Sequence, residues 1–156
     1  MNAIIRNRWI SAVHECRTHL IRIHQALARL SNRFPFTKPA YEGLDEKDIA
    51  SVDQVVFRFT KLQDTIGTKV FPFGLQILGE ETTAVPFIDQ LSRLEQLGFI
   101  QSVEKWMEWR ELRNDLAHEY PDTIDDRIES LNALSCALAE IEKIFSDFTA
   151  RVESHL

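Results

Sequence analysis

The chain has 156 residues, of which 44% are hydrophobic and 27% charged, the composition of one globular domain that can bury a core without disulfides or metals. Its five glycines and five prolines are too few for a β-sandwich or barrel, which needs a turn about every ten residues. No apolar run reaches the roughly 18 residues of a membrane span, and a formal net charge of −6 argues against an indiscriminate nucleic-acid binder.

One mostly helical domain is therefore expected over residues 1–156, with no membrane association. The N-terminal stretch has charges scattered through it and does not have the pattern of a signal peptide. We therefore expect a cytoplasmic protein, in whose reducing environment Cys16 and Cys136 are two small buried side chains.

The first expected helix has about seven turns and ends near Asn32. Its apolar residues recur at spacings of three and four, which is the pattern of one buried helix face, and its arginines fall between them and should face outward. The helix also contains His14, His19 and His24. Because a spacing of five rotates each histidine by about 140° from the last, the three cannot hold one ion, and we expect no metal site.

The next stretch joins the first helix to a second one. Residues 33–47 contain two prolines and a glycine and are expected to cross the end of the bundle as a linker. The second helix is expected to begin at Asp48 or Ser51, which are both good N-cap residues. Gly67 is expected to kink or end it, and a short helix or turn follows.

Further helices follow to the end of the chain. One is opened by Pro86 and closed by Gly98, the next is capped by Ser102, and the last is capped by Asp122 or Thr123. With four long helices and one short one, an all-α, antiparallel up-and-down bundle is the economical arrangement.

Charge is distributed unevenly along the chain. Residues 1–38 hold seven bases and one acid, a net charge of +6, whereas residues 39–156 hold 11 bases and 23 acids, a net charge of −12. The basic segment is either a surface that meets an anion, or a solvated face whose arginines pair with acids elsewhere in the bundle. Both interpretations stay open at this point.

The chain lacks the common enzyme signatures, and its densest polar cluster is RNDLAHEYP at the end of the penultimate helix. Arg113 offers a planar fork of donors to a phosphate, His118 exchanges a proton near neutral pH, and the amide of Asn114 can orient one of them. Because Arg113 and His118 point about 140° apart on a helix, a shared cleft needs a frayed helix end or a second copy of the chain. The alternative is a structural cluster in which both pair with Asp115 and Glu119.

The cluster resembles the R-x4-H-x-Y motif of the HEPN superfamily. The closest match is the HepT-like group, whose members pair with minimal nucleotidyltransferases in bacterial and archaeal toxin–antitoxin systems. The resemblance is carried by Arg113, Asn114, His118 and Tyr120, and the helical layout matches over nearly the whole chain. It implies a metal-independent endoribonuclease without a cofactor, acting on RNA as a homodimer whose two motifs meet at one cleft.

The resemblance also implies a role for each motif residue. Arg113 would bind and polarise the scissile phosphate, His118 would serve as general acid and base for attack by the ribose 2′-OH, and Asn114 flanks the arginine. Tyr120 matches the tyrosine to which the partner enzyme adds AMP, and a charged nucleotide beside His118 would block an RNA cleft. Because the chain lacks the strands, GS-type turn and clustered aspartates of a nucleotidyltransferase, we expect it to be the partner of one.

An RNA cleft in an acidic protein needs local positive charge. Candidate sources are pairs of Arg113, the arginine-rich first helix, and Arg58 and Lys61 on the second helix. Two other interpretations stay open: a non-catalytic HEPN-fold subunit that binds a nucleotidyltransferase or its substrate, and an unrelated helical interaction protein.

Overall fold

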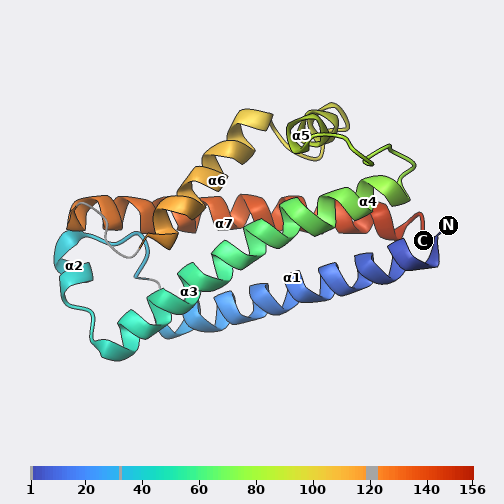
Figure 1. The fold of residues 1–156 in the computed structure, drawn as a ribbon. Helices are drawn as coiled ribbons and strands as arrows, with labels where there is room; N and C mark the ends of the chain where they lie inside the picture. The colour runs from blue at the N-terminus through green and yellow to red at the C-terminus, as the bar shows by residue number, and fades with distance from the viewer. Residues whose placement is uncertain (1, 32, 119–122) are drawn as a thin grey trace.

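A computed structural model describes residues 2–31, 33–118 and 123–156, and every regular element in these ranges is helical (Figure 1). Four long helical segments form the bundle. The first is α1 (Ala3–Arg29), and the second is a continuous run of α3 (Glu46–Thr65), the π-helical turn η1 (Ile66–Val70) and α4 (Phe71–Ile77). The third and fourth are α6 (Val103–Ala117) and α7 (Ile124–Glu153). Short helices α2 (Lys38–Glu42) and α5 (Phe87–Gln96) join them. The all-α up-and-down bundle is confirmed, and in the described ranges no helix has the length and apolar character to cross a membrane.

Helix α1 is shorter at its C-terminal end than predicted. Its first turn is capped by Asn2, whose side chain accepts a hydrogen bond from the backbone N–H of Ile4 (3.0 Å). It ends at Arg29, because Ser31 adopts the left-handed backbone conformation (φ 48°) that terminates helices. The predicted end at Asn32 itself lies outside the described residues.

The second long helix begins at Glu46, before either predicted start. Asp45 is the N-cap, and its side chain accepts the N–H of Asp48 (2.8 Å) while the Asp48 carboxylate accepts the N–H of Asp45 (3.3 Å). The prediction named Asp48, which is the N3 residue of this capping box, as one of two possible caps. Gly67 does not end the helix either, because the chain passes through the turn of π-helix and continues to Ile77.

The helix ends predicted from turn chemistry in the second half of the chain are confirmed. Helix α5 begins directly after Pro86, and Gly98 follows it with a left-handed backbone (φ 78°). Ser102 and Thr123 cap α6 and α7, each accepting a hydrogen bond from the backbone N–H three residues on. The predicted linker is not entirely irregular, because Thr37 caps the short helix α2 within it.

Aromatic side chains fill the centre of the bundle. The ring of Phe148 on α7 lies edge-on to Trp9 (6.0 Å between centroids) and to Phe71 (5.3 Å), and Phe71 also contacts Trp106 (4.8 Å). Gly74 lets α4 approach this group, since a Cβ atom there would lie 2.5 Å from the Phe148 ring. The core therefore ties α1, α4, α6 and α7 together.

The two cysteines have different environments. Cys16 is fully buried, as predicted, and burial raises the pKa of its thiol to about 12. Cys136 is exposed, so its predicted burial is wrong. It lies between Leu134 and Ala137 along α7, on the side that faces away from the core.

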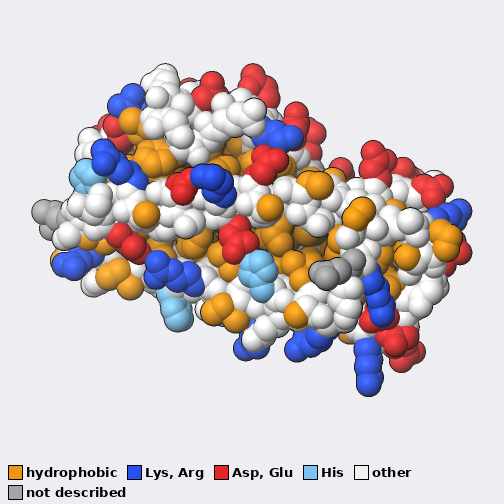
Figure 2. Space-filling model, turned by 180° about the vertical axis from the view of Figure 1, so that it is seen from behind, with side chains coloured by type: hydrophobic (Ala, Val, Ile, Leu, Met, Phe, Trp, Pro, Cys, Tyr) orange, Lys and Arg blue, Asp and Glu red, His pale blue; other side chains and the backbone are white. Residues whose placement is uncertain are grey.

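The basic N-terminal segment is partly neutralised by acids from later in the chain. Three ion pairs do this: Arg17 with Glu153, Arg33 with Asp48, and Lys38 with Asp125. The remaining bases are exposed and have no acidic partner among the described residues: Arg6, Arg8, Arg22 and Arg29. On the face shown in Figure 2, basic and acidic side chains are interspersed, with hydrophobic side chains between them. The interpretation of paired arginines therefore holds for part of the segment only.

A polar contact links α1 to α3 inside the bundle. His19 is 8% exposed, and its Nδ1 accepts a hydrogen bond from Nη1 of Arg58 (3.2 Å). Burial, followed by the charge of Arg58, lowers the pKa of His19, so the ring is neutral at neutral pH. One turn before it on α1, a hydrogen bond from Lys69 (2.8 Å) lowers the pKa of Glu15, whose Oε1 lies 3.8 Å from Nε2 of His19.

Candidate functional site

Arg113, Asn114 and His118 lie on and directly after the last turns of α6, which the core holds in place. Trp106 and Leu116 are buried on this helix, which packs against α3 and α7. That orientation leaves Arg113 half-buried at the side of the helix and Asn114 and His118 exposed. The last turn therefore presents polar groups on both sides of a rigid support.

The guanidinium of Arg113 is fixed by neighbouring side chains. Its Nη1 donates to Oε1 of Gln63 (3.0 Å) and Oδ1 of Asp64 (3.2 Å), both on α3. Its Nε (3.3 Å) and Nη2 (3.0 Å) donate to Oδ1 of Asn114. The amide of Asn114 thus orients the arginine, and one Nη2 hydrogen is left for another acceptor.

His118 is turned away from Arg113 by the end of the helix. It is the C-cap of α6, with an extended backbone (φ −73°, ψ 127°), and its N–H donates to the carbonyl oxygen of Asp115 (3.3 Å). As a result the two motif side chains line different hollows of the same chain: His118 a larger cavity and Arg113 a smaller one.

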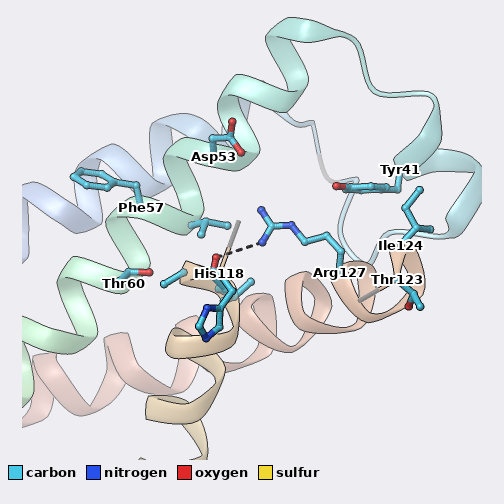
Figure 3. Close-up of a pocket in the computed structure, with 11 residues that line it drawn as sticks. Tyr41, Asp53, Phe57, Thr60, His118, Thr123, Ile124 and Arg127 are labelled. Carbon is cyan, nitrogen blue, oxygen red and sulfur yellow. Dashed lines mark hydrogen bonds between the residues drawn. The ribbon is translucent and has the colours of Figure 1, made fainter. Parts of the chain in front are cut away.

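The larger cavity has a volume of about 750 Å³ and lies between α2, α3, the end of α6 and the start of α7 (Figure 3). Its polar and aromatic lining comprises Tyr41, Asp53, Phe57, Thr60, His118, Thr123 and Arg127. In Figure 3 the side chain of Arg127 extends from α7 toward the end of α6, and the hydroxyl of Tyr41 points toward it. The imidazole of His118 lies on the other side of the α6 end.

Arg127 brings a positive charge to this larger cavity. It is half-buried, its Nη1 donates to the carbonyl oxygen of Leu116 (3.4 Å), and it has no acidic partner in the described ranges. Asp53 supplies the opposing charge across the cavity. In the described part of the chain, no group of three or more His, Cys, Asp or Glu side chains is arranged to hold a metal ion.

The smaller cavity, of about 340 Å³, lies between α3–η1–α4, α5 and α6. Its polar and aromatic lining comprises Gln63, Asp64, Thr68, Phe87, Gln90, Trp106, Arg110 and Arg113. The two arginines against one aspartate give this lining a net positive charge. It therefore offers cations and aromatic rings in one cavity that is open to solvent.

The other predicted site residues are placed as follows. Lys61 is exposed, and its Nζ lies 5.8 Å from the ring centroid of Phe57, which lines the larger cavity. Arg58 lies 5.6 Å from the same ring, but its Nη1 is bound to His19. The structure therefore brings Lys61 to the edge of the larger cavity. The side chain of Arg58, which is on α3, is instead held by its hydrogen bond to His19 of α1. Tyr120 lies outside the described residues.

Several residues of both cavities were not found from the sequence. Gln63 and Asp64 lie 50 and 49 residues before Arg113, and no short-range pattern links them to the motif. Arg127 lies on the first turns of α7, where its sequence context is that of any solvated helix arginine. The one available signal was its nearness to the motif in the sequence, on the other side of Pro121.

Comparison with other proteins adds no family to this description. No family model matches the chain, and no curated protein or solved structure matches it. The resemblance to the HEPN superfamily therefore depends on the four motif residues and on the helical layout.

Proposed function

We propose that the protein is a metal-independent endoribonuclease, the toxin of a pair with a minimal nucleotidyltransferase, and that its active site forms between two copies of the chain. The observation that carries this proposal is the last turn of α6. There, an arginine oriented by Asn114 and an exposed histidine are held on a helix whose buried residues Trp106, Trp109 and Leu116 pack into the core. These are the groups that cleavage of a phosphodiester needs when no metal takes part.

The requirement for a second copy follows from the separation of the two motif side chains. Arg113 and His118 line different cavities of one chain, so one copy alone does not present both to one phosphate. A symmetric dimer repeats every surface feature and can set the imidazole of one copy opposite the guanidinium of the other. Exposed apolar side chains near the larger cavity, Phe57 (53%) and Ile124 (44%), suit such a contact.

The reaction that fits these groups is an internal transesterification. The neutral imidazole of His118 accepts the proton of the ribose 2′-OH, and the 2′-oxygen forms a bond to phosphorus. The bond from phosphorus to the 5′-oxygen breaks, and the His118 imidazolium formed in the first step returns its proton to that oxygen. The products are a 2′,3′-cyclic phosphate and a 5′-hydroxyl. Arg113 stabilises the charge that develops on the phosphate oxygens through its remaining N–H.

Tyr120 is the proposed point of control. The partner enzyme would transfer AMP from ATP to the phenol oxygen with release of pyrophosphate. The added phosphate and base, two residues from His118, exclude RNA by repulsion and occupancy. Incubation of the pair with ATP and magnesium should raise the intact mass in multiples of AMP, and the increase should vanish in Tyr120→Phe. A gain that persists in this variant removes Tyr120 from the scheme.

The direct test compares cleavage by matched histidine variants. Purified wild-type protein should cut RNA in the presence of EDTA, and His118→Ala should lower the rate by at least about 100-fold. His14→Ala is the control, because His14 is also exposed but lies on α1. If wild type and His118→Ala are equally inactive as purified proteins and equally harmless in cells, the ribonuclease proposal fails.

Mixing variants tests whether the site is shared. If each site takes its arginine from one copy and its histidine from the other, a dimer has two such sites. In a mixed dimer of one Arg113→Ala chain and one His118→Ala chain, one of these two sites keeps both side chains. Random mixing of the two inactive proteins should therefore restore about a quarter of wild-type activity. Absence of any recovery, with exchange of subunits confirmed by mass, contradicts a shared site.

A second function is favoured by one specific observation, the ion pair that Arg113 forms with Asp64 of the same chain. In a non-catalytic HEPN-fold subunit, this pair is purely structural, and the larger cavity binds the nucleotidyltransferase or its substrate. That function predicts a stable complex with the enzyme and no RNA cleavage under any condition. The histidine comparison above separates the two functions.

A further inference from the structure

An open groove of about 660 Å³ lies between α1 and α7, and none of its lining residues lines either cavity described above. Two side-chain contacts bridge it: the ion pair of Arg17 with Glu153 (3.0 Å) and the hydrogen bond of His24 with Glu142 (2.9 Å). Because the residue numbers rise along α1 and fall along α7 from one contact to the next, the helices are antiparallel, and the two chain ends lie side by side in Figure 1. The two contacts also show which residues of α1 lie level with which residues of α7.

Uncharged side chains lie beside the two bridging contacts and are exposed. On α1, Ile21 is 57% exposed and is the neighbour of both Arg17 and His24, because residues three and four apart are adjacent on a helix surface. On α7, the exposed residues Ala139 and Ala150 each lie three residues before a bridging glutamate. This face therefore presents an apolar side chain on one helix and small side chains on the other, so a further helix can approach it closely.

The two helices carry charges of opposite sign beside this face. Arg22 and Arg29 are seven residues apart, so they lie on one side of α1, and they are exposed without an acidic partner among the described residues. Glu140 and Asp147 are likewise seven residues apart and exposed on α7. Glu140 has no basic partner in the described ranges, and Asp147 pairs with Lys143 through two exposed side chains, a contact that contributes little. The same spacing on antiparallel helices makes the two pairs of charges complementary.

We infer that this face binds a second copy of the chain, with α1 of each copy lying antiparallel on α7 of the other. A twofold axis along the groove exchanges the two helices and keeps every residue at its level. Counted from the contact of His24 with Glu142, Arg29 of one copy then lies within about one turn of Glu140 of the other, and Arg22 within about one turn of Asp147. By symmetry, each dimer contains four such pairs around the apolar centre.

The charges of this face favour a second copy over an anionic lipid surface or RNA. Either of these would be attracted by the arginines of α1 but repelled by the carboxylates of α7, whereas a second copy satisfies both. The overlap from Arg17 to Arg29 is only about 20 Å long, so pairing should be weak, with a Kd in the micromolar range or higher. Because the groove lines neither cavity, this pairing does not depend on the ribonuclease proposed above and can join two of its dimers.

Analytical ultracentrifugation of matched charge variants of the full chain tests this inference. Wild-type mass should rise with concentration between about 1 and 500 μM. Arg22→Glu with Arg29→Glu sets acid against acid, and Glu140→Arg with Asp147→Arg sets base against base, so either double variant alone should associate about tenfold or more weakly. Mixing the two double variants places acidic α1 on basic α7 and basic α1 on acidic α7, and should restore association. Failure of the mixture to associate overturns the inference.

A control variant separates this contact from a general effect of charge. Arg6→Glu with Arg8→Glu makes the same change on exposed residues of α1, but at a level beyond the end of α7, because Arg17 already lies level with Glu153. It should associate like wild type, and all variants should keep the urea midpoint of unfolding, since the substituted side chains are exposed. Equal association in every variant overturns the inference, whether or not the chain cleaves RNA.

An arm with vesicles tests the lipid surface as the other occupant. Vesicles of phosphatidylserine and phosphatidylcholine should not sediment the wild-type chain more than vesicles of phosphatidylcholine alone. If the wild type stays at one mass at all concentrations and sediments with the phosphatidylserine vesicles, and Arg22→Glu with Arg29→Glu abolishes this, the face binds lipid and the inference is overturned. RNA cleavage by a chain that lacks this association removes only the present inference, and association in a chain that never cleaves RNA removes only the ribonuclease.

Discussion

Replacement of Arg113 by alanine should destabilise the single chain, whatever it does to catalysis. The side chain of Arg113 is only 16% exposed, and it donates to Gln63, Asp64 and Asn114. Its removal leaves three acceptors to find other partners. They differ in how easily water reaches them, and this difference sets the size of the effect.

Gln63 accounts for most of the expected loss. It is 2% exposed, and a buried acceptor without its donor costs about 1–3 kcal/mol. The Asp64 side chain is 55% exposed, and an ion pair with so accessible a partner contributes about 0–1 kcal/mol. Asn114 is exposed and can bind water. We therefore expect Arg113→Ala to lower the free energy of unfolding by about 2 kcal/mol, or the Tm by about 4–8 °C in a domain of this size.

Urea unfolding followed by circular dichroism at pH 7 measures this loss. Arg110→Ala, one turn earlier on the exposed side of α6, is the matched control and should stay within about 0.5 kcal/mol of wild type. Gln63→Leu combined with Arg113→Ala should recover part of the loss, since no buried acceptor is then left unpaired. If Arg113→Ala unfolds at the wild-type urea concentration, the arginine does not hold this network, and the argument from its fixed orientation fails.

Three further predictions concern the bundle around the site. Because the pKa of His19 is lowered in the folded chain, the unfolded chain takes up a proton first as the pH falls. Its contribution to stability should therefore be complete above the ordinary histidine pKa of about 6.5 and decrease below it. His19→Gln should make the urea midpoint of unfolding less dependent on pH between 5.5 and 7.5, and a wild-type midpoint that is equally independent of pH contradicts this. Gly74→Ala should destabilise by about 1–3 kcal/mol in thermal unfolding, because its methyl group would lie 2.5 Å from the Phe148 ring; an unchanged Tm rules out the close approach. A thiol reagent should label the exposed Cys136 rapidly and the buried Cys16, whose pKa is about 12, only on unfolding; two fast thiols in the native chain contradict this.

The sequence predicted the parts of the fold that local chemistry determines. The caps Ser102 and Thr123 and the left-handed Gly98 depend on a few neighbouring residues, and all three were found. The prediction that Gly67 ends the helix was wrong, because glycine propensity is worth only about 1 kcal/mol in a helix. Packing of this buried residue beside Phe87 and Trp106 overrides such a term.

The candidate site was predicted less completely than the fold, for a geometric reason. The motif residues are adjacent in sequence, so Arg113, Asn114 and His118 could be named without a structure. Their partners come from α3 and α7, and which residues meet α6 depends on how three helices are rotated against one another. Gln63 and Arg127 enter the two cavities only through that packing.

The end of α6 explains why one motif serves two cavities. Arg113 is still in the helix and faces α3, whereas His118 has left helical geometry and faces the start of α7. Each cavity therefore has an arginine of its own: Arg113 lines the smaller one, and Arg127 lines the larger one, which His118 also lines. If RNA occupies both, Arg127→Ala should weaken its binding even though Arg127 lies outside the motif. Because each cavity lacks one group of the motif, a cleavage site that uses both groups has to be assembled across two copies.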